Sequence, residues 1–446
     1  MDGYPARGAP SASVRVSTTT TTSFPSRRRR CVRAGRPTVF AREASSRDAE
    51  DAENAARDVV VFVNAKSGGR RGKEVLRRLR RALKPPHRVL DATKLAAAID
   101  RGDPEATTWD ARSTRVLVAG GDGTVGHVAD ALRRVRTPPP IAIAPLGTGN
   151  DLARVLGWND DVWDDERLFD ERRLVSTLRR ADVGGVDRWK LDARRRGRAE
   201  TTTRVFTNYL GIGVDARAAL AFDTVRKDAR FSWLFAHAAT NKLLYAVFGA
   251  RDFLQHSFAR LDEDVVVVVD DRVVEFPSDT EGIILLNINS FSGGVRMWSS
   301  ADRGARGDAT FTKSREDDGA LEIVAVTGAL HLGQLNARVA KPVQVAQGRR
   351  VRVELKRDLP VQIDGEPWLQ RAGTLDVSFL DSLAVLRRPR RDRLNDLLDK
   401  WFQFASSDGG DEDGGAKTSL SRFRRAALVA CFVVAAAFAA WKTWFA

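Results

Sequence analysis

The sequence predicts an α/β domain built on a parallel sheet, followed by a second, β-rich domain with antiparallel strands. Over residues 58–182, short apolar runs alternate with glycine-rich turns and segments of helical periodicity, which is typical of a parallel α/β sheet. Over residues 183–404, most apolar runs follow one another across turns, which favours antiparallel pairing. The chain has 446 residues, which is enough for two such cores.

In the first domain, each of three strands is expected to be followed by a glycine-rich loop and a helix. Residues 59–63 are continuous, β-branched and few, as in a buried strand, and the helix after them covers about residues 73–83. The pattern returns with a strand at 115–119 and a helix that ends near residue 134. It returns once more with a strand at 141–144, again followed by a glycine-rich loop and a helix.

In the second domain, six apolar runs indicate strands: 205–214, 265–269, 283–288, 321–327, 351–355 and 361–363. A helical insertion over about residues 217–249 interrupts them. An amphipathic helix at 391–402 is expected to close this domain.

The two ends of the chain have compositions that differ from the middle. Residues 1–57 are expected to form a disordered tail, and their first 42 residues are rich in Ser, Thr and Arg and nearly free of acid, as in an organelle transit peptide. A plain disordered basic tail is the alternative. Residues 405–425 have the Gly- and Asp-rich composition of a flexible linker.

Residues 426–446 are expected to form a membrane-anchor helix. This apolar stretch would measure about 31 Å as a helix, enough to cross the ~30 Å hydrocarbon core of a bilayer. A helix that lies on the membrane or forms oligomers is the alternative. Together the two ends predict attachment to an organelle membrane, most readily a plastid's, with the cytosolic face of the endoplasmic reticulum as the alternative.

Charge and cysteine content exclude two classes of protein. The formal net charge is +15, but more than half of it lies in residues 1–42, so the folded part lacks the spread of basic charge expected of a nucleic-acid-binding protein. Cys31 and Cys431 are the only cysteines, and one lies in each tail. A cysteine-based zinc site and a disulfide framework within the folded part are therefore excluded.

Three glycine-rich loops carry the chemistry, and each follows a predicted strand. They are residues 64–69 (N-A-K-S-G-G), 120–124 (G-G-D-G-T) and 145–151 (P-L-G-T-G-N-D). In open parallel sheets ligands bind beyond the carboxyl ends of the strands. Glycine lets backbone N–H groups approach an anion closely, and the following helix adds its positive dipole end. The sequence therefore predicts a phosphate-binding site built from all three loops.

Asp122 in the second loop indicates a metal ion. The string Gly121-x-Gly123-x-x-Gly126 matches a dinucleotide fingerprint, yet a carboxylate beside a pyrophosphate repels it unless a cation lies between them. Asp122 therefore favours Mg²⁺, which proteins bind through one or two carboxylates plus substrate phosphates. A turn-forming Asp is the alternative. The sequence lacks the P-loop motif and the protein-kinase signatures.

Several strings, in this order, resemble the diacylglycerol kinase catalytic domain: N-x-K-S-G-G, G-G-D-G-T and P-L-G-T-G-N-D-L-A-R. The resemblance continues into the family's accessory domain at residues 208–216, 241–245, 286–290, 318–322 and 362–368. It covers roughly residues 58–390 and implies a two-domain lipid-kinase architecture of the eukaryotic type. Ala65 stands where the family usually has Pro, and two cysteines are too few for the Cys-rich domains of animal relatives.

The resemblance implies roles for individual residues. It places the ATP phosphates against Gly120, Gly121, Gly123 and Thr124 and the nucleotide against Asn64, Ser67, Gly68, Gly69, Gly147, Thr148, Gly149 and Asn150. Asp122 would act through Mg²⁺, directly or through water. Asp364 is expected to be the general base, with Glu366 as its electrostatic or metal-water partner, because residues two apart in an extended segment face the same side. An ordinary Asp-Gly turn is the alternative.

The activity that the resemblance implies is ATP- and Mg²⁺-dependent phosphorylation of 1,2-diacylglycerol in a membrane, which yields phosphatidic acid. Two alternatives remain open. A sphingoid-base or ceramide kinase would use the same chemistry on another lipid. A nucleotide-binding membrane adaptor without catalysis belongs to another class, and the presence of Asp122, Asp364 and Glu366 speaks against it.

Overall fold

A computed structural model describes residues 58–67, 71–107, 109–110, 112–135, 137–147, 149–159, 162–227, 260–299, 311–328, 331, 334–335 and 342–389. Both tails, the linker, residues 228–249 of the expected insertion and the expected helix 391–402 lie outside the described residues. Within the described part of the chain, no helix is long and apolar enough to cross a membrane.

The first half of the chain forms the predicted parallel α/β arrangement. Four strands pair in parallel in the order β2-β1-β3-β4: β1 (Asp58–Val63), β2 (Arg88–Asp91), β3 (Thr114–Gly120) and β4 (Ile141–Pro145). The helices that follow β1, β3 and β4 are α2 (Arg71–Ala82), α5 (Asp122–Leu132) and α6 (Asp151–Leu156). Strand β2 was not predicted, since its four residues carry little apolar signal.

Shorter helices complete this half: η2 (Ala92–Lys94), α3 (Leu95–Asp100), α4 (Pro104–Thr107), α7 (Asp165–Phe169) and α8 (Glu171–Arg179). Its core is a single apolar cluster that includes Phe62, Leu79, Leu117 and Trp158, all fully buried. The indole of Trp158 stacks on Trp163 with ring centroids 5.4 Å apart. Apolar residues of β1, β3 and β4 and of α2, α5, α6 and α8 belong to this cluster, so the parallel strands are buried against the helices of the same half.

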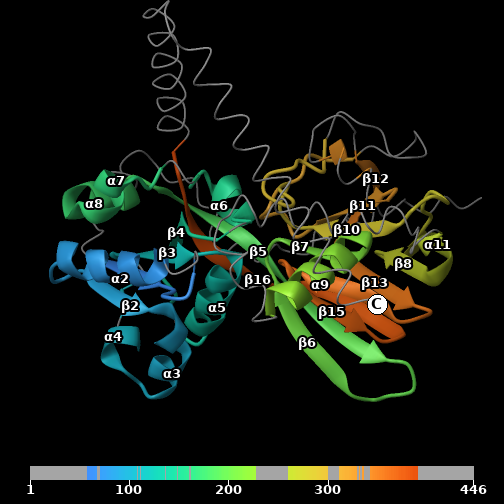
Figure 1. Cartoon of the computed structure of the whole chain (residues 1–446), viewed down its shortest axis with the longest axis horizontal. Helices are drawn as coiled ribbons and strands as arrows, with labels where there is room; N and C mark the ends of the chain where they lie inside the picture. The colour runs from blue at the N-terminus through green and yellow to red at the C-terminus, as the bar shows by residue number, and fades with distance from the viewer. Residues whose placement is uncertain are drawn as a thin grey trace, which may run out of the picture. The chain divides into compact units, whose positions relative to one another are not determined.

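Two long strands that the sequence did not reveal connect this half with the rest. Strands β5 (Asp182–Arg195) and β16 (Gly373–Arg387) pair with each other in antiparallel fashion, and Figure 1 shows them side by side between the two groups of elements. Strand β16 also pairs with β4 at one end and with β13 at the other. The first sheet therefore has ten strands and runs through both halves.

The remaining strands confirm the predicted antiparallel, β-rich domain. Strands β6 (Thr201–Phe206), β8 (Val265–Val269), β9 (Arg272–Val274) and β13 (Arg350–Leu355) extend the first sheet. The second sheet has the order β12-β11-β10-β7-β14-β15: β12 (Val343–Gly348), β11 (Leu321–Val326), β10 (Gly282–Leu286), β7 (Tyr209–Gly213), β14 (Leu359–Ile363) and β15 (Glu366–Gln370). Helices α9 (Val214–Lys227) and α11 (Leu261–Asp264) adjoin them.

The expectation of one continuous strand over 205–214 is wrong. Strand β6 ends at Phe206 in the first sheet, and β7 begins at Tyr209 in the second. The backbone N–H groups of Thr207 and Asn208 at this crossing point are therefore free of ladder pairing and available to a side chain.

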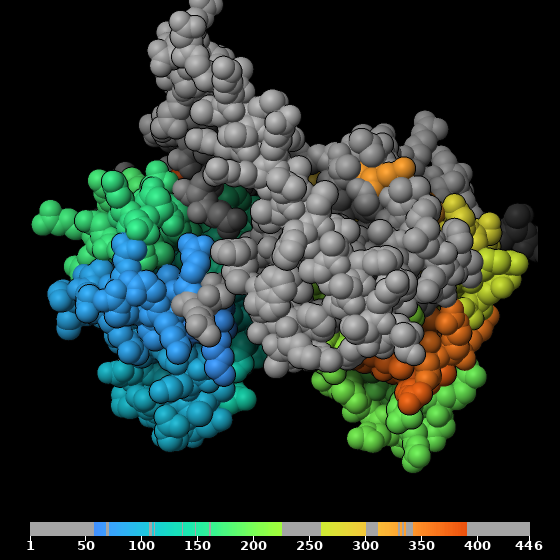
Figure 2. Space-filling view, in the orientation of Figure 1, coloured from blue at the N-terminus to red at the C-terminus, as the bar shows by residue number. Residues whose placement is uncertain are grey.

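We call the described residues of 58–181 the first lobe and those of 196–372 the second lobe. At the surface, the blue and cyan residues of the first lobe gather on one side of Figure 2, and the yellow and orange residues of the second lobe lie apart from them. The two apolar cores meet along β16, because Leu383 and Val385 belong to the first core while Leu375 and Val377 belong to the second.

Candidate active site

The glycine-rich loops after β1, β3 and β4 lie in contact, as expected for one sheet edge. Asn64 donates a hydrogen bond from its amide to the Thr124 hydroxyl (2.9 Å), which joins the first loop to the second. A Cβ atom on Gly147 would come within 2.7 Å of the Cα atom of Gly121, so the second and third loops touch through backbone alone. A side chain at either glycine would push the loops apart.

The third loop is shaped by its own asparagine. Asn150 adopts a left-handed backbone conformation (φ 52°), and its side-chain amide accepts a hydrogen bond from Gly147 N–H (3.0 Å) and donates one to the Gly147 carbonyl (2.8 Å). Its amide therefore closes the loop in addition to any part in nucleotide binding. Thr148, Gly68 and Gly69, which the sequence also assigned to the nucleotide, lie outside the described residues.

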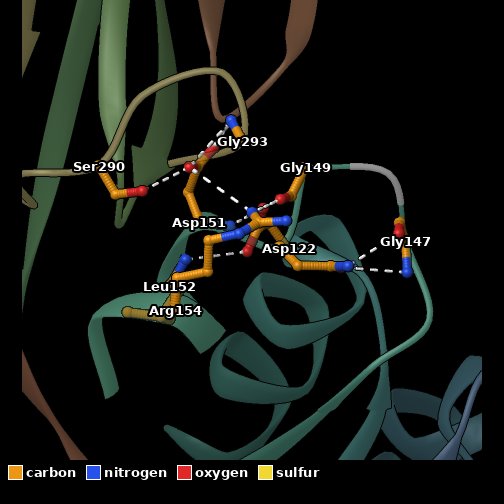
Figure 3. A network of polar contacts seen from close by, with 9 residues as sticks. Asp122, Gly147, Gly149, Asp151, Leu152, Arg154, Ser290 and Gly293 are labelled. Carbon is orange, nitrogen blue, oxygen red and sulfur yellow. Dashed lines mark hydrogen bonds and ion pairs between the residues drawn. The ribbon is translucent and has the colours of Figure 1, made fainter. Parts of the chain in front are cut away.

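Asp122 joins the second loop to the helix after the third. It is the first residue of α5, and its carboxylate accepts hydrogen bonds from the backbone N–H groups of Asp151 (3.0 Å) and Leu152 (3.3 Å) at the start of α6 (Figure 3). These hydrogen bonds join two different loops at the sheet edge. A turn-forming Asp, which was the alternative, would bond only to its own turn. Burial, followed by the charge of Asp151, raises the pKa of Asp122 to about 6 although its hydrogen bonds act in the opposite direction.

Asp364 faces this edge from the second lobe. It lies in a tight Asp-Gly turn between β14 and β15, where Asp364 (φ 48°) and Gly365 (φ 84°) are both left-handed. The expected extended conformation of residues 364–366 is therefore wrong, and the alternative of an Asp-Gly turn is right about the local backbone. The turn nevertheless aims the carboxylate inward.

The Asp364 carboxylate is held by the backbone where the chain crosses between the sheets. It accepts hydrogen bonds from the N–H groups of Thr207 (2.9 Å), Asn208 (2.9 Å) and Tyr209 (3.0 Å). Burial and, to a smaller extent, the charge of Asp122 raise the pKa of Asp364 to about 7, although the three N–H groups act in the opposite direction. A carboxyl that titrates near neutral pH at a fixed position is suited to general-base catalysis.

Glu366 also reaches the second loop. It is the exposed first residue of β15, and a Cβ atom on Gly123 would lie 3.4 Å from its Oε1 atom. The structure thus brings together the glycine loops, Asp122, Asp364 and Glu366, which are far apart in the sequence.

Three further residues support this arrangement and were not among the predicted site residues. Asn208 hydrogen bonds to Asp122 through its side chain. Gln362 accepts a hydrogen bond from Gly365 N–H (2.8 Å) and donates one to buried Asp215 (2.9 Å), which fixes the Asp-Gly turn. Each of the three residues lies in a segment that resembles the diacylglycerol kinase family, but the sequence does not show which residues of these segments contact one another.

The carboxylates fit a metal ion that is held mostly by a nucleotide. Within the described residues, no group of three or more His, Cys, Asp or Glu side chains is arranged to hold a metal ion. Asp122 and Asp364 raise each other's cost of ionisation, since the charge of Asp122 raises the pKa of Asp364. Such a pair suits Mg²⁺, which keeps most of its ligands from phosphates and water.

Comparison with known proteins gives the family. A sequence model described as the diacylglycerol kinase catalytic domain matches residues 58–186, and one described as the diacylglycerol kinase accessory domain matches residues 205–367. The chain belongs to the diacylglycerol kinase family. The described carboxylates and glycines of the site all lie within the two matched ranges.

Curated members of the diacylglycerol kinase family are similar over most of this chain. Diacylglycerol kinase 2 of Arabidopsis thaliana is 37% identical over 75% of this chain and 46% of its own length. Diacylglycerol kinase theta of Homo sapiens is 38% identical over 72% of this chain and 34% of its own length. The chain thus spans less than half the length of these two relatives.

A solved structure of a diacylglycerol kinase from Bacillus anthracis aligns with 74% of this chain and 97% of its own, at 18% identity and a TM-score of 0.44.

Proposed function

We propose that this chain is a kinase that transfers the γ-phosphate of ATP to the free hydroxyl of 1,2-diacylglycerol and forms phosphatidic acid. The observation that carries the proposal is the position of Asp364. Its carboxyl has a pKa of about 7 and lies close enough to Asp122 of the glycine-rich loops for the charge of Asp122 to raise that pKa. The matched domains and the curated relatives support diacylglycerol as the lipid.

The proposed reaction assigns the proton to the second lobe and the phosphate to the first. Asp364 accepts the proton of the lipid hydroxyl while the oxygen of that hydroxyl forms a bond to the γ-phosphorus. The bond from that phosphorus to the bridging oxygen of ATP breaks, and ADP leaves. Backbone N–H groups of the glycine-rich loops bind and orient the phosphates.

Mg²⁺, when bound with ATP, supplies positive charge that offsets the charge developing on the phosphates. In this proposal Asp122 is the residue that holds it, directly or through water, and Glu366 is its partner near Gly123.

We also propose that residues 426–446 hold the enzyme at an organelle membrane, with residues 1–42 as the transit peptide. The composition of these two segments supports this proposal. Imaging of the tagged full chain with and without residues 1–42 tests it. A signal that stays cytosolic or reticular in both cases would refute the organelle address.

The experiment that tests the activity is a lipid phosphorylation assay. The full chain receives radiolabelled ATP, Mg²⁺ and mixed micelles that contain diacylglycerol, sphingosine or ceramide. We expect label in phosphatidic acid, lost by a factor of about 10² or more in the Asp364→Asn variant. The matched control is Asp110→Asn, an exposed turn aspartate that also accepts a backbone N–H and precedes β3, at the opposite end of that strand from Gly120.

Label in sphingosine or ceramide instead would assign the chain to the alternative lipid with the same chemistry. Absence of label in every lipid, from a folded chain that binds ATP, would favour the nucleotide-binding adaptor.

A further inference from the structure

One buried carboxylate at the site has no part in the reaction proposed above. Asp151, the first residue of α6, is fully buried in the first lobe. Its Oδ1 atom accepts a hydrogen bond from the hydroxyl of Ser290 (2.6 Å), and both its oxygens lie 3.1 Å from the backbone N of Gly293. Ser290 and Gly293 follow β10 in the second lobe, so these hydrogen bonds join the lobes.

Asp151 also touches the phosphate-binding loops through its backbone. Its N–H group donates to Asp122 of the second loop, and the residues before it form the third loop. One residue thus binds the glycine loops with its main chain and the second lobe with its side chain, as Figure 3 shows.

Arg154, one turn further along α6, reinforces the same junction. Its guanidinium donates to the carbonyl of Gly149 and lies 3.9 Å from the Asp151 carboxylate. Its Cδ atom would be 3.3 Å from a Cβ atom on Gly294 of the second lobe. The side chain therefore fills the space between the third glycine loop and the segment around residue 294.

The energetics favour a specific connection over incidental contact. A buried carboxylate is costly unless hydrogen bonds satisfy it, and hydrogen bonds to an ionised group are shorter and stronger than neutral ones. The Ser290 bond, at 2.6 Å, is among the short ones. Loss of that donor would leave a buried charge partly unsatisfied.

We propose that Asp151 and Ser290 form a latch that positions the nucleotide loops of the first lobe against Asp364 of the second. They are positioning residues and touch neither reacting atom. This inference rests on the proposed function, because the latch matters most where phosphate and base come from different lobes. Displacement of reacting groups by about 1 Å can lower a rate by about 10².

The test compares two serine-to-alanine variants of the full chain. Ser290→Ala removes the latch donor. Ser314→Ala is the matched control, because the Ser314 hydroxyl also donates to a buried carboxylate, Glu322 (3.0 Å), but both residues lie in the second lobe. We expect kcat for lipid phosphorylation to fall at least about tenfold in Ser290→Ala, whereas KM for ATP and Kd for ADP change less than about twofold.

The control should keep kcat within about twofold while losing a similar amount of thermal stability, since each variant loses one hydroxyl bond to a buried acidic side chain. Ser290→Cys, which keeps the volume but donates weakly, should give an intermediate kcat. Equal kcat in the two alanine variants would overturn the latch. So would a loss of ADP affinity as large as the loss of kcat, since it would assign Ser290 to nucleotide binding.

Hydrogen exchange provides a readout that does not depend on activity. The amides of Asp151 and Leu152 should exchange faster in Ser290→Ala than in the wild-type chain and be unchanged in Ser314→Ala. If the wild-type chain phosphorylates no lipid, the proposed function fails while this comparison still tests the latch. Unchanged exchange at these two amides in Ser290→Ala would refute it.

Discussion

Replacement of Asp364 by Asn should remove activity and, at the same time, remove a pH-dependent loss of stability. The raised pKa of about 7 means that the folded protein favours the protonated carboxyl, whereas the unfolded chain ionises near the ordinary value. Stability contributed by the proton therefore falls as pH rises from the unfolded pKa toward 7, and it levels off above 7.

The size of this effect follows from the pKa. Between pH 5.5 and pH 7, one carboxyl with a folded pKa of about 7 lowers the free energy of unfolding by about 1.4 kcal/mol per pH unit, or about 2 kcal/mol in all. Carboxyls with raised pKa values that do not interact with Asp364, such as Asp215 and Glu322, are the same in both proteins and cancel in the comparison. The variant has no charge at position 364 and should lack this component.

The assay is chemical denaturation of the wild-type chain and Asp364→Asn at pH 5.5 and pH 8.5, together with kcat/KM over the same range. We expect the difference in unfolding free energy between the two proteins to shift by about 2 kcal/mol in favour of the variant at the higher pH. Wild-type kcat/KM should rise through an apparent pKa near 7. Parallel stability curves for the two proteins would show that Asp364 does not titrate near neutral pH and would remove the basis for its role as the base.

Three other substitutions test separate parts of the structure. Gly147→Ala should lower ADP affinity at least about tenfold in calorimetry, because its Cβ atom would lie 2.7 Å from Gly121, whereas Gly126→Ala, with open space around it, should not. Arg188→Met should cost about 2 kcal/mol in urea denaturation, because it removes two bonds to Asp381 (2.7 and 2.8 Å) while Asp381 keeps its contact with Arg133 (2.9 Å), and activity per folded molecule should persist. Glu322→Gln should stabilise the chain above pH 8, since burial raises the pKa of Glu322 to about 8 and its charge must then form inside the protein; equal stability of the two at pH 9 would contradict this.

The sequence predicted correctly those elements that depend on local patterns of residues. Short apolar runs predicted β1, β3 and β4, and glycines after those strands placed the phosphate-binding loops at one edge. Strands β5 and β16 were not predicted. For β5 the reason is physical. Asp187 and Arg188 are buried within β5, so its apolar pattern is broken, and the buried charges are satisfied only by distant partners such as Gly319 N–H and Asp381.

The direction of the Asp364 and Glu366 side chains could not be predicted from the sequence either. The spacing of Asp364 and Glu366 suggested an extended pair, but an Asp-Gly sequence between two strands favours left-handed residues and a tight turn. What makes that turn functional is the set of N–H groups at residues 207–209, where the chain changes sheets. That crossing depends on the whole topology, and no local pattern contains it.

Asp122 shows how a single residue can serve two needs. The sequence predicts that its carboxylate binds a metal ion. Each carboxylate oxygen also accepts a hydrogen bond from a backbone N–H group at the start of α6, where the helix dipole favours a negative charge. An Asn at this position would place an N–H₂ group against one of those donors. Loss of activity in an Asp122 variant would therefore report a disturbed loop junction as well as any lost metal. The two roles can be separated only in a chain that keeps the carboxylate. The measurement is the ADP affinity of the wild-type chain with and without Mg²⁺. A higher ADP affinity with Mg²⁺ requires a metal ion at the site, because the loop junction alone cannot produce it.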